Sequence, residues 1–403
     1  GSIAGRMYTE YCSAVQNTEV RIENIDNAML MTPASGNYAF DLSGSANYTV
    51  VPTKNTGVLN GVSTFDMVRI TKHILGKDPF TSPYQFIAAD VNGSGDVSTF
   101  DIIQLRKLIL NLITEFPDDM PSWRFIDAGY EFTTEAPAAE AFPESIQINN
   151  LNGTIPDLDF IAIKLGDING SAAANATASA ESRTTTDNMV IEIEDRTVEA
   201  GEIIEVPFGA TAFKNIEGYQ FTLQFEGLEL QQFIEGVATE ANFGFGLQER
   251  GYLVTSWNNL STQANADAPE LFRLKFKATQ NGKLADLLAI NSAVTTSESY
   301  HSNGSLLGVE LKAKPVITTF DLAQNTPNPF TTETTIGFEL PAAAVVELNI
   351  IDLQGKVVQT QRGDFAKGAQ RMVVSANELP NGTYYYQLVT PFGVAAKKMI
   401  VLR

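Results

Sequence analysis

A run of oxygen-bearing residues around position 90 has the types and spacing of a calcium loop. Counting Asp90 as position 1, oxygen donors fall at positions 1, 3, 5, 7, 9 and 12, and a glycine stands at position 6. The donors are Asp90, Asn92, Ser94, the Asp96 carbonyl, Ser98 and Asp101. Calcium prefers oxygen ligands of this kind, and the glycine permits the sharp turn of an EF-type loop. We therefore expect a calcium site here, although position 12 holds Asp where calcium-sensor loops have Glu.

The segment from Asn55 to Leu75 is a weaker copy of the segment from Asp90 to Leu110, at an offset of 35 residues. In this copy only Asn55, the Gly61 carbonyl, Ser63 and Asp66 could act as ligands, so we expect a weak or empty second site. A repeated loop and helix is a unit that buries its apolar face against its copy. An Asx-rich turn that caps a helix is the alternative, but a turn alone does not explain the repeat.

This paired pattern, over residues 55–116, resembles a dockerin module, whose repeats carry Asp at position 12. The resemblance implies calcium as the cofactor and a cohesin as the partner. It places the partner-binding surface at the helix starts and the basic residues beyond them, namely Thr64, Phe65, Thr99, Phe100, Arg106 and Lys107.

Half of a third loop occurs farther along the chain. Asp167, Asn169 and Ser171 mimic positions 1, 3 and 5, but position 12 would be Ala178, which has no side-chain oxygen. We therefore favour an ordinary Asx turn at this segment over a third metal site.

Composition limits the function classes. The 403 residues suggest roughly two to four domains, and a net charge of -20 disfavours nucleic acid and anionic membranes as partners. The single cysteine, Cys12, excludes an internal disulfide framework, and no apolar run is long enough to span a membrane. Residues Gly1 and Ser2 are consistent with a cloning scar or a cut point in a longer precursor, so earlier processing is assumed.

Alternating patterns elsewhere predict a mainly β protein with three β-sandwich domains and the small α-helical dockerin-like module. Residues 1–54 resemble a transthyretin-like or carboxypeptidase-regulatory-like sandwich. Residues 117–188 are interpreted as an irregular connector that ends in a linker rich in Ser, Ala and Thr.

Residues 189–314 alternate strictly and carry short phrases that resemble a cohesin domain. These phrases are Ala200-Gly201-Glu202, Gly218-Tyr219-Gln220-Phe221-Thr222-Leu223 and Ser256-Trp257-Asn258. Because cohesins are the receptors of dockerins, each resemblance supports the other. A generic jelly-roll or immunoglobulin-like sandwich is the alternative.

Residues 315–403 resemble the type A C-terminal sorting domain of the type IX secretion system. The matching residues include Asn328, Pro329, Phe330, Asp352, Gly355, Gly382, Tyr384, Lys397, Lys398 and Arg403. The resemblance implies a Bacteroidetes-type Gram-negative bacterium, the secretion machinery as a partner, and a location outside the outer membrane.

The histidine inventory argues against an enzyme, because only His73 and His301 exist and they lie in different predicted domains. No phosphate-binding glycine loop and no His/Cys metal cluster appear, although a pair of catalytic carboxylates stays open. We predict an exported, non-enzymatic assembly protein that uses its dockerin-like and cohesin-like modules for association, with head-to-tail fibre formation as one form. The alternative is a non-catalytic export and anchoring tail of a larger secreted enzyme or adhesin.

Overall fold

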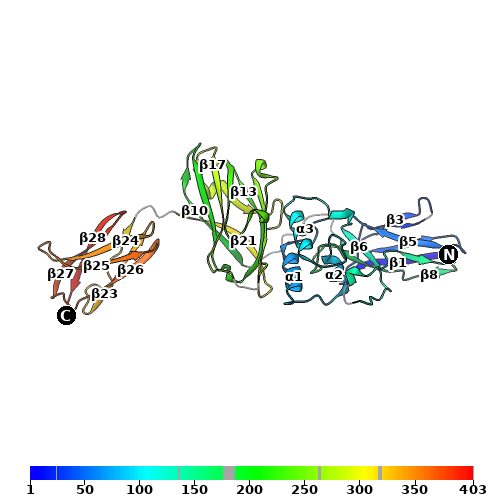
Figure 1. Cartoon of the computed structure of the whole chain (residues 1–403), viewed down its shortest axis with the longest axis horizontal. Helices are drawn as coiled ribbons and strands as arrows, with labels where there is room; N and C mark the ends of the chain where they lie inside the picture. The colour runs from blue at the N-terminus through cyan, green and yellow to red at the C-terminus, as the bar shows by residue number, and fades with distance from the viewer. Residues whose placement is uncertain (24, 135–136, 176–186, 262–264, 316–319, 403) are drawn as a thin grey trace. The chain divides into compact units, whose positions relative to one another are not determined.

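The computed structural model describes residues 1–23, 25–134, 137–175, 187–261, 265–315 and 320–402. Its internal contacts divide the chain into two compact units, Gly1–Ala313 and Lys314–Arg403. The predicted mainly β class is confirmed: strands dominate both units, and the longer helices gather in one part of the first unit (Figure 1).

The first unit begins with a two-sheet sandwich, which we call the N-terminal sandwich. One sheet has the order β4-β1-β9-β6, with β8 pairing β1, and the other has the order β3-β2-β5-β7. The strands are β1 (Ser2–Thr9), β2 (Glu19–Ile22), β3 (Met29–Met31), β4 (Asn37–Asp41), β5 (Tyr48–Thr53), β6 (Trp123–Asp127), β7 (Ile146–Ile148), β8 (Thr154–Ile155) and β9 (Phe160–Lys164).

Strands β6 to β9 correct the interpretation of residues 117–188 as an irregular connector. Strand β9 pairs in parallel with β1, with Met7 opposite Phe160, and β7 pairs with β5. Every residue of β9 is buried, because one face packs in the sandwich core and Ile161 and Ile163 on the other pack against the helix that contains Ile87. A strand covered on both faces loses the polar alternation by which strands are recognised.

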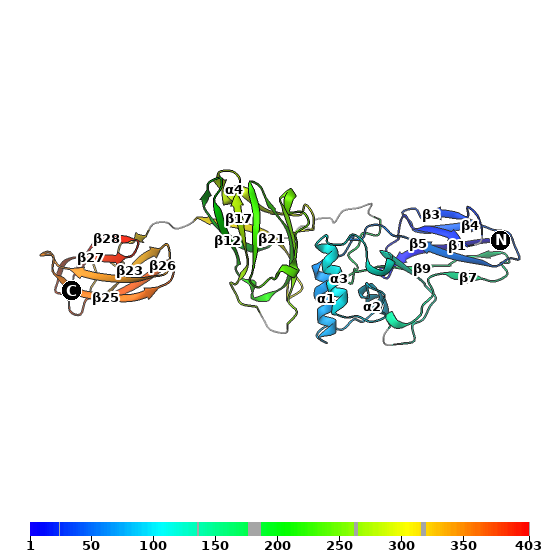
Figure 2. The ribbon, with the colours of Figure 1, turned by 45° about the horizontal axis from the view of Figure 1, so that its top comes forward.

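Three helices form the helical module: α1 (Thr64–Ile74), α2 (Pro83–Ala89) and α3 (Thr99–Ile109). Each begins with a serine whose hydroxyl accepts a backbone N–H, and each has a capping box, closed by Asp66, Gln85 and Asp101 respectively. The helices share a core that includes Met67, Ile102 and Leu105. Figure 2 shows α1 and α3 at one end of the N-terminal sandwich, opposite the end that holds the N-terminus.

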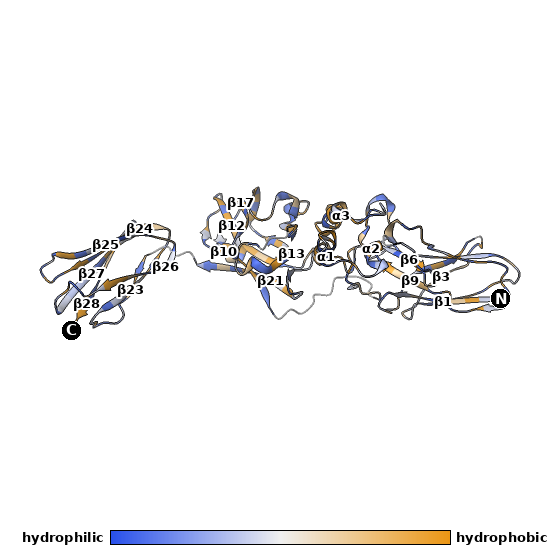
Figure 3. Cartoon of the chain, turned by 60° about the horizontal axis from the view of Figure 1, so that its bottom comes forward, coloured by the Kyte–Doolittle hydropathy of each residue, from blue (hydrophilic) through white to orange (hydrophobic). Residues whose placement is uncertain are grey.

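The second sandwich of the first unit, which we call the central sandwich, closes around one aromatic-rich core. Its strand order is β14-β17-β12-β10-β21-β20-β13-β16-β15, with β19 pairing β13. Phe208 stacks on Phe272 with ring centroids 4.6 Å apart. Figure 3 shows hydrophobic and hydrophilic colours interspersed on the strands of the central sandwich.

The strands of the central sandwich are β10 (Asn188–Asp195), β11 (Thr197–Val198), β12 (Ile203–Ala210), β13 (Ile216–Phe225), β14 (Leu228–Glu235), β15 (Phe243–Gly244), β16 (Tyr252–Asn258), β17 (Glu270–Ala278), β18 (Gly282–Lys283), β19 (Leu288–Asn291), β20 (Glu298–His301) and β21 (Leu306–Pro315). Its helix is α4 (Leu284–Leu287). Short 3-10 turns of the first unit are η1 (Pro117–Asp119), η2 (Pro137–Ala139), η3 (Phe213–Asn215), η4 (Glu240–Asn242) and η5 (Gln248–Arg250).

The second unit, which we call the C-terminal domain, is a sandwich of the sheets β22-β23-β26 and β25-β24-β27-β28. Its core includes Phe330, Leu348 and Tyr386. The strands are β22 (Asp321–Leu322), β23 (Glu333–Leu340), β24 (Ala344–Ile351), β25 (Val357–Phe365), β26 (Gly368–Ser375), β27 (Gly382–Thr390) and β28 (Gly393–Val401). Across the described residues of both units, no helix has the length and apolar character needed to cross a membrane.

Candidate functional site

The loop that precedes α3 gathers the oxygen atoms expected of a calcium loop. The Asp90 carboxylate accepts hydrogen bonds from the Ser94 amide at 2.9 Å and the Gly95 amide at 2.7 Å. The Ser94 hydroxyl donates to the Asp96 carbonyl and to Asp90, both at 3.2 Å. The Asn92 side-chain oxygen also faces the Ser94 amide, at 3.1 Å. Positions 1, 3, 5 and 7 therefore converge on one small region.

Asp101 closes this loop from the first turn of α3. One of its oxygens accepts from the Val91 amide at 3.0 Å, and the other accepts from the Ser98 amide at 2.8 Å. Both Asp90 and Asp101 are buried. Burial raises the pKa of Asp101, and the Asp90 charge adds to the rise. Two buried carboxylates beside neutral oxygens are a donor set that suits a hard divalent cation, so the residues present fit calcium.

The second copy of the loop keeps its later positions and loses its first. Asp66 accepts from the Ser63 amide at 2.9 Å, as Asp101 does from Ser98, and the Gly61 carbonyl accepts from Ser171 at 3.1 Å. The Asn55 side chain, expected at position 1, instead accepts a hydrogen bond from the Ser122 amide at 3.0 Å. Burial and the Asp167 charge raise the pKa of Asp66.

The start of α1 is docked on the central sandwich. The Thr64 amide donates to the Gln220 side chain at 2.7 Å, and the Thr64 and Ser256 hydroxyls are hydrogen-bonded at 2.7 Å. All three side chains are at most 2% exposed. The Phe65 ring packs on Tyr300, with ring centroids 5.3 Å apart. Thr64 is thus fully buried against strands β13 and β16 and is hydrogen-bonded to both.

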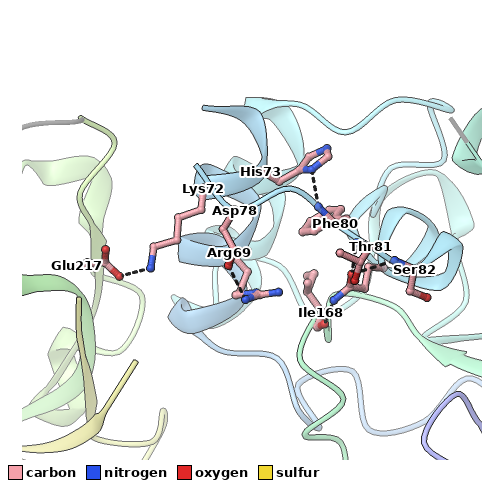
Figure 4. Close-up of polar contacts among 10 residues, drawn as sticks. Arg69, Lys72, His73, Asp78, Phe80, Thr81, Ser82, Ile168 and Glu217 are labelled. Atoms are coloured by element: carbon pink, nitrogen blue, oxygen red, sulfur yellow. Dashed lines mark hydrogen bonds and ion pairs between the residues drawn. The ribbon is translucent and has the colours of Figure 1, made fainter. Parts of the chain in front are cut away.

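Farther along the module, Asn258 of β16 joins both long helices. Its amide nitrogen donates to the Thr71 hydroxyl at 3.1 Å, and its oxygen accepts from the Arg106 guanidinium. Burial lowers the pKa of Arg106. Lys72 forms an ion pair with Glu217 at 2.7 Å, which Figure 4 shows crossing from α1 to the central sandwich.

Two glycines allow the close approach. A Cβ on Gly218 would meet side-chain atoms of Val68 and Thr64 at 3.0 and 3.1 Å. A Cβ on Gly244 would lie 2.2 Å from the Leu110 carbonyl oxygen, at the end of α3. The backbones of the helical module and the central sandwich therefore touch at positions where a side chain does not fit.

The predicted partner-binding residues divide into two groups. Thr64, Phe65 and Arg106 make the contacts given above, whereas Thr99 and Phe100 are exposed and Lys107 is half-buried. Val68, Thr71 and Lys72 were not among the predicted contact residues. Gln220, Ser256 and Asn258, which receive α1, lie within the phrases that resemble a cohesin. Small and polar residues at helical spacing along one face of α1 are the signal that could have found the helix residues.

The predicted sorting residues lie at several places in the C-terminal domain. The Asn328 side chain accepts from the Ile400 amide at 2.9 Å, and Phe330 is buried beside β28. Asp352 and Gly355 form the turn between β24 and β25, and the Tyr384 hydroxyl donates to the Pro380 carbonyl at 3.0 Å. Gly382, Lys397 and Lys398 lie on the paired strands β27 and β28, with both lysines exposed. Arg403 lies outside the described residues, as does Ala178.

Among the described residues no three or more His, Cys, Asp and Glu side chains gather at one point. The loop before α3 contains the two carboxylates of Asp90 and Asp101, and its remaining candidate ligand oxygens come from Asn, Ser and the main chain. His73, on α1, accepts a hydrogen bond from the Phe80 amide at 3.0 Å, which is a structural role.

Comparison with known proteins identifies two of these regions. Residues 326–402 match the family model "Secretion system C-terminal sorting domain", and residues 60–110 match "Dockerin type I domain". The predicted sorting domain and dockerin module are thereby confirmed. A comparison with curated proteins found no match.

Several of the solved structures that the chain resembles contain cohesins. One is a type I cohesin–dockerin complex from Clostridium thermocellum, at 12% identity and a TM-score of 0.26, covering 33% of this chain and 94% of that chain. Another is a type II cohesin from Acetivibrio cellulolyticus, at 15% identity and a TM-score of 0.24, covering 31% of this chain and 92% of that chain. A third is a non-cellulosomal cohesin from Archaeoglobus fulgidus, at 18% identity and a TM-score of 0.22, covering 31% of this chain and 86% of that chain.

The recognised modules are non-catalytic. Together they mark a secreted or cell-surface protein with a role in protein–protein assembly.

Proposed function

We propose that this chain is an exported assembly protein whose helical module binds its central sandwich, with calcium ordering the module. The observation that carries this proposal is the insertion of Thr64 between Gln220 and Ser256, where the buried amide and hydroxyl of Thr64 each have a hydrogen-bond partner. Buried polar groups without partners are costly, so a contact of matched donors and acceptors favours one specific mate.

The difference between the two helix copies supports a specific contact. Thr64 and Thr99 occupy equivalent positions in the same Ser-Thr-Phe-Asp sequence, yet Thr64 is fully buried and Thr99 is exposed. The central sandwich therefore receives α1 at its start and α3 only near its end, through Arg106 and Leu110.

Calcium at the loop before α3 is part of the proposal. Asp90, Asn92, Ser94, the Asp96 carbonyl, Ser98 and Asp101 would hold it. Bound calcium would neutralise the two buried carboxylates, and its binding free energy would add to the folding free energy of the module. The caps and core of α3 then hold Arg106 toward Asn258.

The same surfaces also provide for self-assembly. When the helical module of one copy binds the central sandwich of another, the contact joins two different patches and leaves one of each free at the ends of the pair. Contacts of this kind propagate head to tail. The contact within one chain is the closed form, and exchange between copies is the polymerising form.

The C-terminal domain supplies export in this proposal. The type IX machinery would recognise the edge formed by β28, where Lys397 and Lys398 are exposed. Exported chains would then display the other modules outside the outer membrane.

Sedimentation velocity of the full chain tests the proposed contact, with Thr64→Arg as the disrupting variant and Thr99→Arg as its matched control. In calcium, we expect Thr64→Arg either to remove concentration-dependent large species or to convert a compact monomer into one with a higher frictional ratio. Thr99→Arg should behave as the wild type. Equal behaviour of all three proteins would overturn the proposal.

The same measurement separates the two forms of the contact. Large species in the wild type that vanish in excess EGTA support calcium-ordered polymers. A compact wild-type monomer at every concentration supports the closed form and rejects head-to-tail fibres.

A further inference from the structure

The turn that follows β9 reproduces the first half of the calcium loop. Residues 167–172, DINGSA, align with residues 90–95, DVNGSG. This turn lies about 100 residues from α1 in sequence and outside the region that matches a dockerin. It nevertheless packs directly on the degraded loop, because a Cβ on Gly61 would lie 2.6 Å from the Ala172 amide nitrogen.

The contacts inside this turn repeat those of the loop at residues 90–101, which we call the intact loop. Asp167 accepts from the Ser171 amide at 3.0 Å and the Ala172 amide at 2.8 Å, where Asp90 accepts from Ser94 at 2.9 Å and Gly95 at 2.7 Å. The Ser171 amide faces Asn169 at 3.0 Å, as Ser94 faces Asn92 at 3.1 Å.

The contacts between the two segments repeat as well. The Ser171 hydroxyl donates to the Gly61 carbonyl at 3.1 Å, where Ser94 donates to the position 7 carbonyl at 3.2 Å. Asp66 accepts from the Ile168 amide at 2.9 Å, where Asp101 accepts from Val91 at 3.0 Å. Positions 1 to 6 at residues 167–172 thus join positions 7 to 12 at residues 61–66.

We propose that the chain completes a second calcium site, which we call the split site, from these two distant segments. Its ligands are Asp167, Asn169, Ser171, the Gly61 carbonyl, Ser63 and Asp66. The proposal rests on the proposed calcium role of the intact loop, and it replaces Asn55 at position 1 with Asp167.

Burial provides a separate reason for a cation. Asp66 is fully buried and Asp167 is 8% exposed, and two carboxylates side by side in the interior are costly without a positive charge between them. The Lys164 ammonium lies near both, but its two hydrogen bonds go to the Val58 and Leu165 carbonyls, at 2.8 Å each. Calcium would meet both carboxylates directly.

The position of this second site gives it a role in assembly. It joins the end of β9, in the N-terminal sandwich, to the loop before α1. Ser63 of the site precedes Thr64, the residue buried against Gln220. Calcium held by both segments would fix the start of α1 in the geometry that docks.

Calcium stoichiometry of the full chain, measured by isothermal titration after chelation, tests the proposal. We expect two equivalents for the wild type, one for Asp167→Asn, one for Asp90→Asn, and two for the control Asp157→Asn, an exposed carboxylate on the same segment. Ser171→Ala, which removes one neutral ligand, should keep the fold and weaken one site. Unfolding curves in chelator identify any variant that fails to fold.

The outcomes separate this proposal from the one on which it rests. If the wild type binds one equivalent of calcium, and Asp90→Asn abolishes that binding while Asp167→Asn does not, the split site is overturned and the calcium site of the intact loop is supported. If the wild type binds one equivalent of calcium that only Asp167→Asn abolishes, the split site is supported and the calcium site of the intact loop is rejected. No binding by the wild type overturns both.

Discussion

Asp90 and Asp96 are both acidic residues of the intact loop, but only Asp90 directs its carboxylate into it. Asp90 accepts two backbone amides and is buried, whereas Asp96 contributes its carbonyl and is exposed. We expect Asp90→Ala to abolish calcium binding at this loop and Asp96→Ala to preserve it, because calcium would use only the main chain at position 7. Titration calorimetry of the two variants checks this. Equal losses in both would contradict the assigned ligand roles.

We expect His73 to make the stability of the helical module depend on pH. Its Nδ1 accepts the Phe80 N–H and its ring stacks on Phe80 at 4.0 Å, so the neutral imidazole is required. Burial lowers the pKa of His73 below its ordinary value near 6.5. The unfolded chain therefore takes up the proton first, so the stabilisation is present above about pH 6.5 and is lost as pH falls.

We expect the free energy of unfolding in calcium to drop between pH 7.5 and pH 5.5, and His73→Asn to reduce that drop. The asparagine oxygen can accept the same N–H but does not titrate. His301→Asn, which changes an imidazole of the central sandwich, is the control. Denaturant titrations at the two pH values provide the measurement, and an unchanged drop in His73→Asn would refute the role of this imidazole.

At the scale of the elements, docking depends on how closely β15 approaches the end of α3. Gly244 leaves no room for a methyl group beside the Leu110 carbonyl, whereas at Gly246, two residues on, a Cβ would enter open space. We expect Gly244→Ala to destabilise the first unit by about 1–3 kcal/mol, as overpacking typically does. Gly246→Ala should have little effect. Chemical denaturation of both variants tests the difference, and similar costs would argue against a tight α3 contact.

At the scale of the whole molecule, the two units have separate hydrophobic cores, and both proposed calcium sites lie in the first unit. We expect two thermal transitions in calorimetry, of which chelation lowers only the one that belongs to residues 1–313. Calcium at roughly 100 times its Kd contributes about 2.7 kcal/mol per site, so a downward shift of several degrees is expected. A C-terminal transition that moves with calcium would contradict this assignment.

The intact loop, the sandwich patterns and the C-terminal sorting domain could be predicted from the amino-acid sequence alone. These features are local: ligand spacing, turn glycines and strand alternation are written in consecutive residues. The loop from Asp90 to Asp101 could be read in this way because all of its positions are contiguous. The same is true of the hairpin turn at Asp352 and Gly355.

Features that depend on residues far apart in the sequence could not be predicted and required the folded structure. Strand β9 carries no alternation because it is covered on both faces, so its sequence alone does not distinguish a strand from a buried helical segment within the predicted connector. Thr64 and Thr99 share one local sequence, and only packing against β13 and β16 distinguishes them. The half-loop at Asp167 has no acidic residue at position 12 along the chain, and only the folded structure brings Asp66 to it, through the hydrogen bond from the Ile168 amide. Local sequence patterns predict interactions between residues that are close in sequence. Which distant segments pair is decided by burial and packing in the folded chain.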